Sequence, residues 1–135
     1  ITSLTCKNQL LSTIDQIPLQ IEILELSDNK FSKFDCKSLI KLRILNLSNN
    51  ELTELQNLPE TLETLECENN QLREVDLATT PTLKVLICSN NPILILQHVP
   101  SSLEKIEMEN NPFVDIDNSE DKDENKKKSK KKFNK

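Results

Sequence analysis

The sequence contains no glycine, no tryptophan and no tyrosine, and only one histidine among its 135 residues. Without glycine no glycine-rich loop can hold a nucleotide phosphate, which excludes the P-loop and the dinucleotide fingerprint. No apolar run approaches the roughly 18 residues that span a membrane, and the chain does not open with a signal-peptide pattern. One histidine and no Cys-x-x-Cys pair also argue against a metal site, and no nucleophile–base pair is evident. We therefore expect no catalytic residues, no metal and no cofactor.

Charge is distributed unevenly along the chain, although the net charge is only −5. Residues 1–116 hold nine basic and seventeen acidic residues, whereas residues 117–135 hold eight lysines and five acidic residues. An acidic body followed by a basic tail favours a basic partner for the body.

One pattern recurs six times: apolar-x-x-apolar-x-apolar-x-x-Asn-x-apolar-x-x-apolar. The copy LRILNLSNNELTEL, residues 42–55, shows it most clearly. Leu45 and Leu47 alternate with Ile44, Asn46 and Ser48, and this period of two predicts a short strand with one buried face. A single such strand cannot bury its apolar face, so neighbouring copies are expected to stack around a shared core. The predicted repeats are 1–20, 21–41, 42–61, 62–82, 83–102 and 103–116. Since the chain opens inside a repeat, we expect it to be part of something longer.

These repeats resemble the leucine-rich repeat family over residues 1–116. The resemblance implies an α/β solenoid, a right-handed superhelix with a parallel β-sheet on its concave face and extended or 3-10 segments on its convex face. In the family, the asparagine that follows the strand bonds to the backbone of the adjacent coil. The residues in that position here are Asn29, Asn50, Asn70, Asn91 and Asn111.

Repeat lengths alternate between 20 and 21 residues, because two kinds of return segment alternate. The shorter kind contains Pro18, Pro59 or Pro100, and proline favours an extended backbone. The longer kind contains Asp35 or Asp76, each of which can cap a short helical turn. The first kind resembles bacterial effector repeats and the second resembles internalin-like repeats. The underlying unit is therefore predicted to be a pair of repeats, one of each kind.

Each of the four cysteines, Cys6, Cys36, Cys67 and Cys88, stands in a position that other repeats fill with an apolar core residue. Unclustered cysteines used as core residues favour a reducing compartment. We therefore predict an intracellular, cytoplasmic protein, with the nucleus as an alternative. His98 lies beside a proline segment, where a structural role is favoured over catalysis.

The outward side chains of the predicted strands carry the functional prediction. One column is largely apolar and the other two are largely acidic, and an exposed apolar stripe edged by charge is typical of a binding surface. The alternative is a solvated sheet face whose β-branched residues only favour strands. The predicted partner is a basic or apolar-basic protein segment, not a small molecule. The predicted contact residues are Ile23, Glu25, Ile44, Asn46, Thr64, Glu66, Glu68, Val85, Ile87, Lys105, Glu107 and Glu109.

The tail at 117–135 is predicted to be disordered, because it has almost no apolar residues. Its lysines could serve nuclear import or contact an anionic membrane, or simply keep the chain soluble. Sequence-specific nucleic-acid binding is not expected, because the body is acidic and lacks stacking aromatic residues.

Two other functions remain open. The chain could be the targeting domain of a larger signalling enzyme, for which the family resemblance allows a phosphatase, cyclase, GTPase or ubiquitin ligase. It could also be a receptor or adhesion ectodomain, although the unclustered cysteines count against that.

Overall fold

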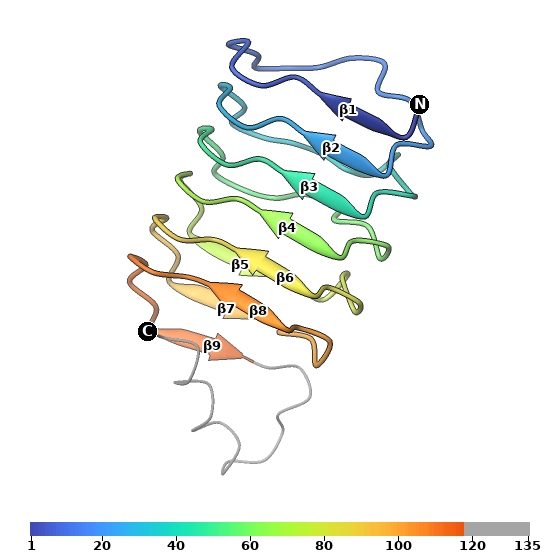
Figure 1. The fold of residues 1–135 in the computed structure, drawn as a ribbon. Coiled ribbons are helices and arrows are strands. Elements are labelled where there is room, and N and C mark those ends of the chain that lie inside the picture. Colours follow the sequence, from blue (N-terminus) through green and yellow to red (C-terminus); the bar gives the residue numbers. More distant parts are fainter. Residues whose placement is uncertain (118–135) are drawn as a thin grey trace.

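The structure, a computed structural model, describes residues 1–117. They form a solenoid of stacked coils (Figure 1). Each coil contributes one strand to a six-stranded parallel sheet, here called the front sheet. Its strands, in spatial order, are β1 (Ser3–Thr5), β2 (Ile23–Glu25), β3 (Ile44–Asn46), β4 (Thr64–Glu66), β6 (Val85–Ile87) and β8 (Lys105–Glu107). The predicted leucine-rich solenoid with a parallel sheet is thereby confirmed.

The strands are short because only their central residue points into the core. Leu24, Leu45, Leu65 and Leu86 are the central residues of four consecutive strands, and each is 0% exposed. Full burial of a leucine side chain stabilises the fold by roughly 1.5–3 kcal/mol. Since each coil supplies several such residues, stacking provides the core that no coil has alone.

A second parallel sheet, here called the back sheet, closes the other side of the last coils. Its strands are β5 (Glu74–Asp76), β7 (Ile95–Gln97) and β9 (Asp115–Asp117), and an isolated bridge joins Asp35 to Gln56 in earlier coils. The sequence predicted extended segments on this side but not their pairing into a sheet.

The helical part of the predicted α/β fold is not confirmed, because residues 1–117 contain no helix. Asp35 and Asp76 do cap a turn as expected. The carboxylate of Asp35 accepts the backbone N–H of Lys37 at 2.9 Å, and that of Asp76 accepts the N–H of Ala78 at 2.9 Å. Each of the following segments forms two short turns before the next strand of the front sheet begins, at 37–38 and 40–41 and at 78–79 and 81–82. Residues 1–117 thus form no helix of a length or apolarity that would cross a membrane.

The last coil extends one residue further than the predicted boundary at 116. Asp117 pairs in register with Gln97, and its carbonyl accepts the backbone N–H of Val99 at 3.1 Å. Backbone pairing with the preceding coil therefore places it in β9 rather than in the tail. The predictions of a disordered tail, and of nuclear-import or membrane contacts by its lysines, fall on residues 118–135 and so lie outside the described residues.

Buried asparagines hold the coils together, as the resemblance implied. The side-chain amide of Asn70 donates to the carbonyls of Leu47 and Cys67 at 3.0 Å each, and its oxygen accepts the N–H of Leu52 at 2.9 Å. Asn29, Asn50, Asn91 and Asn111 bond in the same way. Because buried backbone groups must be paired, this ladder supplies bonds that tie each coil to the one before it.

The residue before each ladder position turns the chain through the left-handed region without using glycine. Asparagine and aspartate tolerate positive φ better than other non-glycine residues. They fill this position in all six coils, with φ between 55° and 60°: Asn8, Asp28, Asn49, Asn69, Asn90 and Asn110. Each Asn-Asn pair in the sequence therefore supplies a turn and then a ladder bond.

Candidate functional site

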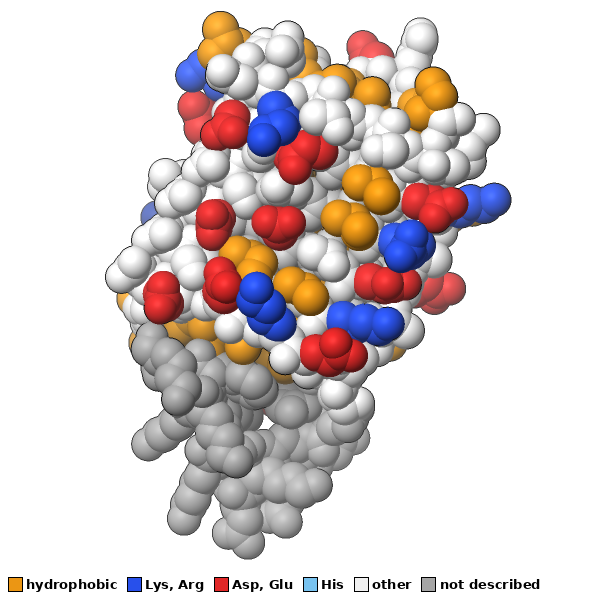
Figure 2. Space-filling view, in the orientation of Figure 1, with side chains coloured by type: hydrophobic (Ala, Val, Ile, Leu, Met, Phe, Trp, Pro, Cys, Tyr) orange, Lys and Arg blue, Asp and Glu red, His pale blue; other side chains and the backbone are white. Residues whose placement is uncertain are grey.

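The predicted contact residues lie on or just beyond the strands of the front sheet, on its solvent side, here called the front face. Acidic and apolar side chains lie side by side across it (Figure 2). Ile23, Ile44 and Val85 are half-buried, and Lys105, Glu107 and Glu109 are exposed. The other half-buried members of the predicted set are Glu25, Asn46, Thr64, Glu66 and Glu68.

Ile87 differs from the rest of the set, because it is only 8% exposed. It pairs in register with Glu66 on one side and Glu107 on the other. It can therefore offer little area of its own to a partner, and it separates two carboxylates with an apolar side chain.

The last residues of β2, β3, β4, β6 and β8 form a row across the front face that we call the central column. They are Glu25, Asn46, Glu66, Ile87 and Glu107. Its three carboxylates recur at every second repeat, so every second strand of this series carries one. Strands are about 4.8 Å apart, which places successive carboxylates of this column about 9.6 Å apart along the sheet. Between them stand an amide and an isoleucine, and neither can neutralise a charge.

Glu25 is held by two hydrogen bonds. One carboxylate oxygen accepts the backbone N–H of Ser27 at 3.0 Å, and the other accepts the side-chain amide of Asn46 at 2.9 Å. The oxygen of Asn46 in turn accepts the N–H of Ser48 at 3.0 Å. The first two residues of the column are therefore preorganised before any partner arrives.

Glu66 is the centre of the column and the most electrostatically perturbed of its carboxylates. Partial burial raises the pKa of Glu66 above its ordinary value, and the charges of Glu25, Glu68 and Glu107 raise it further, against a smaller lowering by Lys105. The ionised form is thus opposed by its own neighbours. A cation placed among these carboxylates would relieve that opposition.

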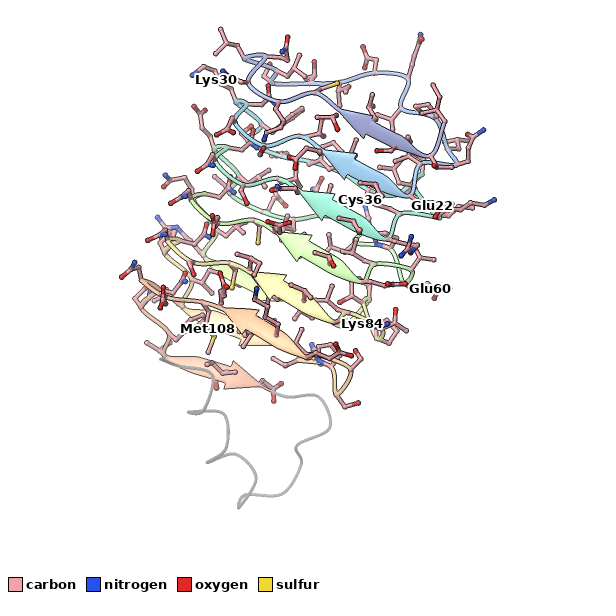
Figure 3. All side chains as sticks on the ribbon, viewed as in Figure 1. Glu22, Lys30, Cys36, Glu60, Lys84 and Met108 are labelled. Carbon is pink, nitrogen blue, oxygen red and sulfur yellow. The ribbon has the colours of Figure 1, made fainter. Side chains whose placement is uncertain are left out.

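A second row of charged residues crosses the front sheet just before the strands begin, and it has a different charge pattern. This edge column consists of Glu22, Arg43, Glu63, Lys84 and Glu104, and its carboxylates also recur at every second repeat. Figure 3 labels Glu22 and Lys84 along this edge. Arg43 lies 3.4 Å from Glu22 and 3.4 Å from Glu63. The pKa of Arg43 is raised, chiefly by its hydrogen bond to Glu63. The chain therefore supplies its own cation here.

On the side of the back sheet, side-chain contacts join one repeat to the next. They recur at every second repeat, as the alternating repeat lengths do. The side-chain amide of Asn57 donates to Asp35 at 2.8 Å, and a ring nitrogen of His98 lies 2.8 Å from Asp76. Asn57 and His98 both have positive φ, at 54° and 57°. The hydrogen bond from Asn57 is the main cause of a lowered pKa at Asp35. The contact with Asp76 gives His98 a structural role of the kind predicted for it.

Sequence reasoning missed the edge column and these side-chain pairs on the back. The signal that could have found both is the recurrence at every second repeat. Glu22 and Glu63 occupy equivalent positions of alternate repeats, and so do Asn57 and His98, just as the prolines do.

Three of the four cysteines are buried as predicted, and Cys6 is half-buried in the first coil; all four are free thiols. Burial raises the pKa of Cys36 and of Cys88 to about 12, and that of Cys67 well above its ordinary value. Since the thiolate is the reactive form, these three behave as core residues rather than as nucleophiles.

The family profile described as Leucine Rich Repeat matches residues 41–60. The functional domain of InlJ from Listeria monocytogenes, which includes a cysteine ladder, is similar in structure with a TM-score of 0.72 and 25% identity. That likeness covers 81% of this chain and 25% of the InlJ chain. This family match and this structural likeness identify the fold as that of a leucine-rich repeat protein.

YopM from Yersinia enterocolitica WA-314 has the same leucine-rich repeat fold, with a TM-score of 0.67 and 22% identity over 87% of this chain and 30% of YopM. The two similar structures thus include one internalin and one effector, the two repeat kinds that the sequence resembled. The chain spans about a quarter to a third of the lengths of these two structures. No curated protein sequence matches it.

Proposed function

We propose that this leucine-rich repeat protein is a non-enzymatic binding module whose front face captures a basic or apolar-basic segment of another protein. The observation that carries the proposal is the row of carboxylates in the central column, of which one, Glu107, has a basic partner in Lys105 at 3.4 Å. Glu25, Glu66 and Glu107 stand on alternate strands with no basic side chain of the column between them. Leucine-rich repeat proteins generally bind protein partners, which supports the same class of function.

The apolar part of the face supports a partner that is more than a string of charges. Ile23, Ile44 and Val85 lie two positions before the central column on their strands and are half-buried. Each CH₂ group that a partner buries against them contributes about 0.8 kcal/mol. The carboxylates contribute less to affinity, because solvent screens them, and more to partner choice and association rate.

A pair of charge reversals tests the proposal. Glu66→Lys combined with Glu107→Lys should weaken binding of an arginine-containing peptide by about ten-fold or more at low salt, because the column then repels the peptide. The matched control is Glu74→Lys combined with Asp115→Lys, which makes the same total charge change at two exposed positions of the back sheet. Kd values can be measured by isothermal titration calorimetry with the full chain.

If the front-face double variant and the back-sheet double variant bind the peptide equally, the front face is not the binding surface. A second check is the glutamate counterpart of the same peptide. It should show no measurable binding to the unchanged protein, and equal affinity for both peptides would reject charge complementarity.

We also propose an intracellular, cytoplasmic location. The four free thiols, three of them buried in the core, support a reducing compartment. Titration of thiols in protein purified under non-reducing conditions and then unfolded should count four. A count of two would mean that a disulfide forms in the natural environment.

A further inference from the structure

The front face carries a regular charge pattern whose spacing limits the shape of its partner. Glu25, Glu66 and Glu107 occupy the same position of β2, β4 and β8, which are successive second neighbours in the sheet. Adjacent strands lie about 4.8 Å apart, so the carboxylates are about 9.6 Å apart and the outer two about 19 Å. A partner that lies along the column must present its cations at that interval.

The edge column shows that one cation can contact two carboxylates that lie two strands apart. Arg43 contacts Glu22 and Glu63 together, from the coil between them. In the central column, Asn46 and Ile87 stand in the equivalent places. Two cations from outside, one over each of these residues, would complete the same alternation of charge.

Regular backbone conformations differ in how well they match about 9.6 Å. A polyproline II segment rises about 3.1 Å per residue with three residues per turn, so every third side chain returns to one side after about 9.3 Å. An extended strand returns after two residues and about 6.6–6.8 Å, which misses the next carboxylate. A helix rises about 10.5 Å over seven residues and is about 2 Å out of register at the outer carboxylate.

Resting on the function proposed above, we propose that the partner segment is a polyproline II stretch with a basic residue at every third position, lying along the central column across the strands. The intervening residues that face the apolar stripe are small and apolar, so that they contact Ile23, Ile44 and Val85. The segment is recognised by its backbone rise and charge interval, and not only by its net charge.

At the β8 end of the front face, an internal ion pair limits how far the partner segment makes strong contacts. Lys105 lies beside the column on β8, and its ammonium group is 3.4 Å from Glu107. This internal ion pair weakens the last carboxylate as a partner contact. The strongest contacts are therefore expected around Glu66, between β2 and β6.

Peptides of identical composition test the interval. The first peptide repeats Arg-Pro-Pro three times. The second is Arg-Pro-Arg-Pro-Arg followed by four prolines. The third has three contiguous arginines followed by six prolines. Binding to the full chain is followed at low salt through NMR shifts of the backbone amides of β2, β4 and β6. The first peptide should bind about five-fold tighter than either of the others, because only its arginines match the column.

A helical comparison and one variant complete the test. An alanine-rich helix with arginine at every seventh position should bind more weakly than the first peptide. Glu66→Gln should reduce the preference for the triplet spacing more than Glu109→Gln does, because Glu109 lies outside the central column.

The outcomes separate the interval from the function. Equal affinities for the three proline peptides, or tighter binding of the alternating or helical peptide, would overturn the polyproline interval while the basic-partner function stands. If none of the arginine peptides binds better than its glutamate counterpart, the proposed function itself fails, and the interval with it.

Discussion

The two charged columns of the front sheet have the same carboxylate interval and opposite electrostatic outcomes. In the edge column, Arg43 lies between Glu22 and Glu63 and contacts both. In the central column, the residue between Glu25 and Glu66 is Asn46, which can only hydrogen-bond. The comparison shows that the fold tolerates a cation in such a row, so its lack in the central column is a property of the sequence rather than of the geometry. In the edge column, the carboxylates are paired with a cation of the chain itself and contribute to the fold. In the central column, the carboxylates beside Asn46 can pair with the cation of a partner.

The largest expected effect comes from removing one residue of the asparagine ladder, which ties together the coils that carry both columns. Asn70→Ala would deprive three backbone carbonyls, and the N–H of Leu52, of their bonds to this side chain. The three carbonyls keep other donors, from Asn50, Asn91 and the N–H of Asn49, so the N–H of Leu52 is the buried group left unpaired. An unpaired buried group costs about 1–3 kcal/mol, and we expect a loss of that size in the free energy of unfolding. Urea denaturation measures it.

The control for that variant is its neighbour. Asn69 is exposed, has φ of 57° and donates one bond to Asn49 at 2.8 Å. Because glycine accepts positive φ, Asn69→Gly should change the free energy of unfolding by less than about 0.5 kcal/mol. Equal losses for both variants would mean that the buried asparagines do not stabilise the stacking of the coils.

A smaller effect is expected when the central column is given the cation that the edge column has. Asn46→Arg should place a cation between Glu25 and Glu66 and weaken binding of (Arg-Pro-Pro) three times by about ten-fold, because the site is then occupied from within. Asn46→Ile is the control, since the next pair of repeats has Ile87 in this position. It should raise the Kd by less than about three-fold, because it removes the hydrogen bond that holds Glu25 but adds no cation. Similar losses from both variants would assign the effect to side-chain shape instead of charge.

The smallest effect comes from the reverse exchange, in which the edge column loses its cation. Arg43→Gln removes two ion pairs whose side chains are 35–44% exposed. Exposed pairs contribute little, so stability should fall by about 0.5 kcal/mol, and peptide affinity should rise by less than about three-fold. A ten-fold rise in affinity would show that the two columns are equivalent binding sites and that the front face has no preferred row.

Much of the fold could be predicted because the same pattern occurs in every repeat. Leu45 and Leu47 alternate with polar residues, and five of the six copies carry the ladder asparagine. The back sheet was missed because its strands depend on pairing between coils. Val75 and Leu96 are buried, but an apolar residue in these positions does not show which backbone groups meet. The short turns after Asp35 and Asp76 were expected to be helical because a cap does not set the length of the segment after it.

The candidate face was predicted residue by residue, but its electrostatics were not. Alternation in the sequence assigned Glu66 and Ile87 to one outward column, and the structure confirms their register. Alternation alone could not show that Ile87 would be 8% exposed, since burial depends on the side chains of both neighbouring strands. It also could not show that Arg43 reaches two carboxylates, because that depends on the side-chain path across three coils.

The pKa of Glu66, followed by carboxyl NMR titration with and without a saturating peptide of three Arg-Pro-Pro units, tests the central claim most directly. In the free protein the pKa of Glu66 should lie above its ordinary value, because partial burial and three neighbouring carboxylates oppose its charge. With the peptide bound, an arginine beside Glu66 should lower that pKa, because an opposite charge favours the ionised form. An unchanged pKa at saturation would contradict the claim that the central column is completed by the cations of a partner.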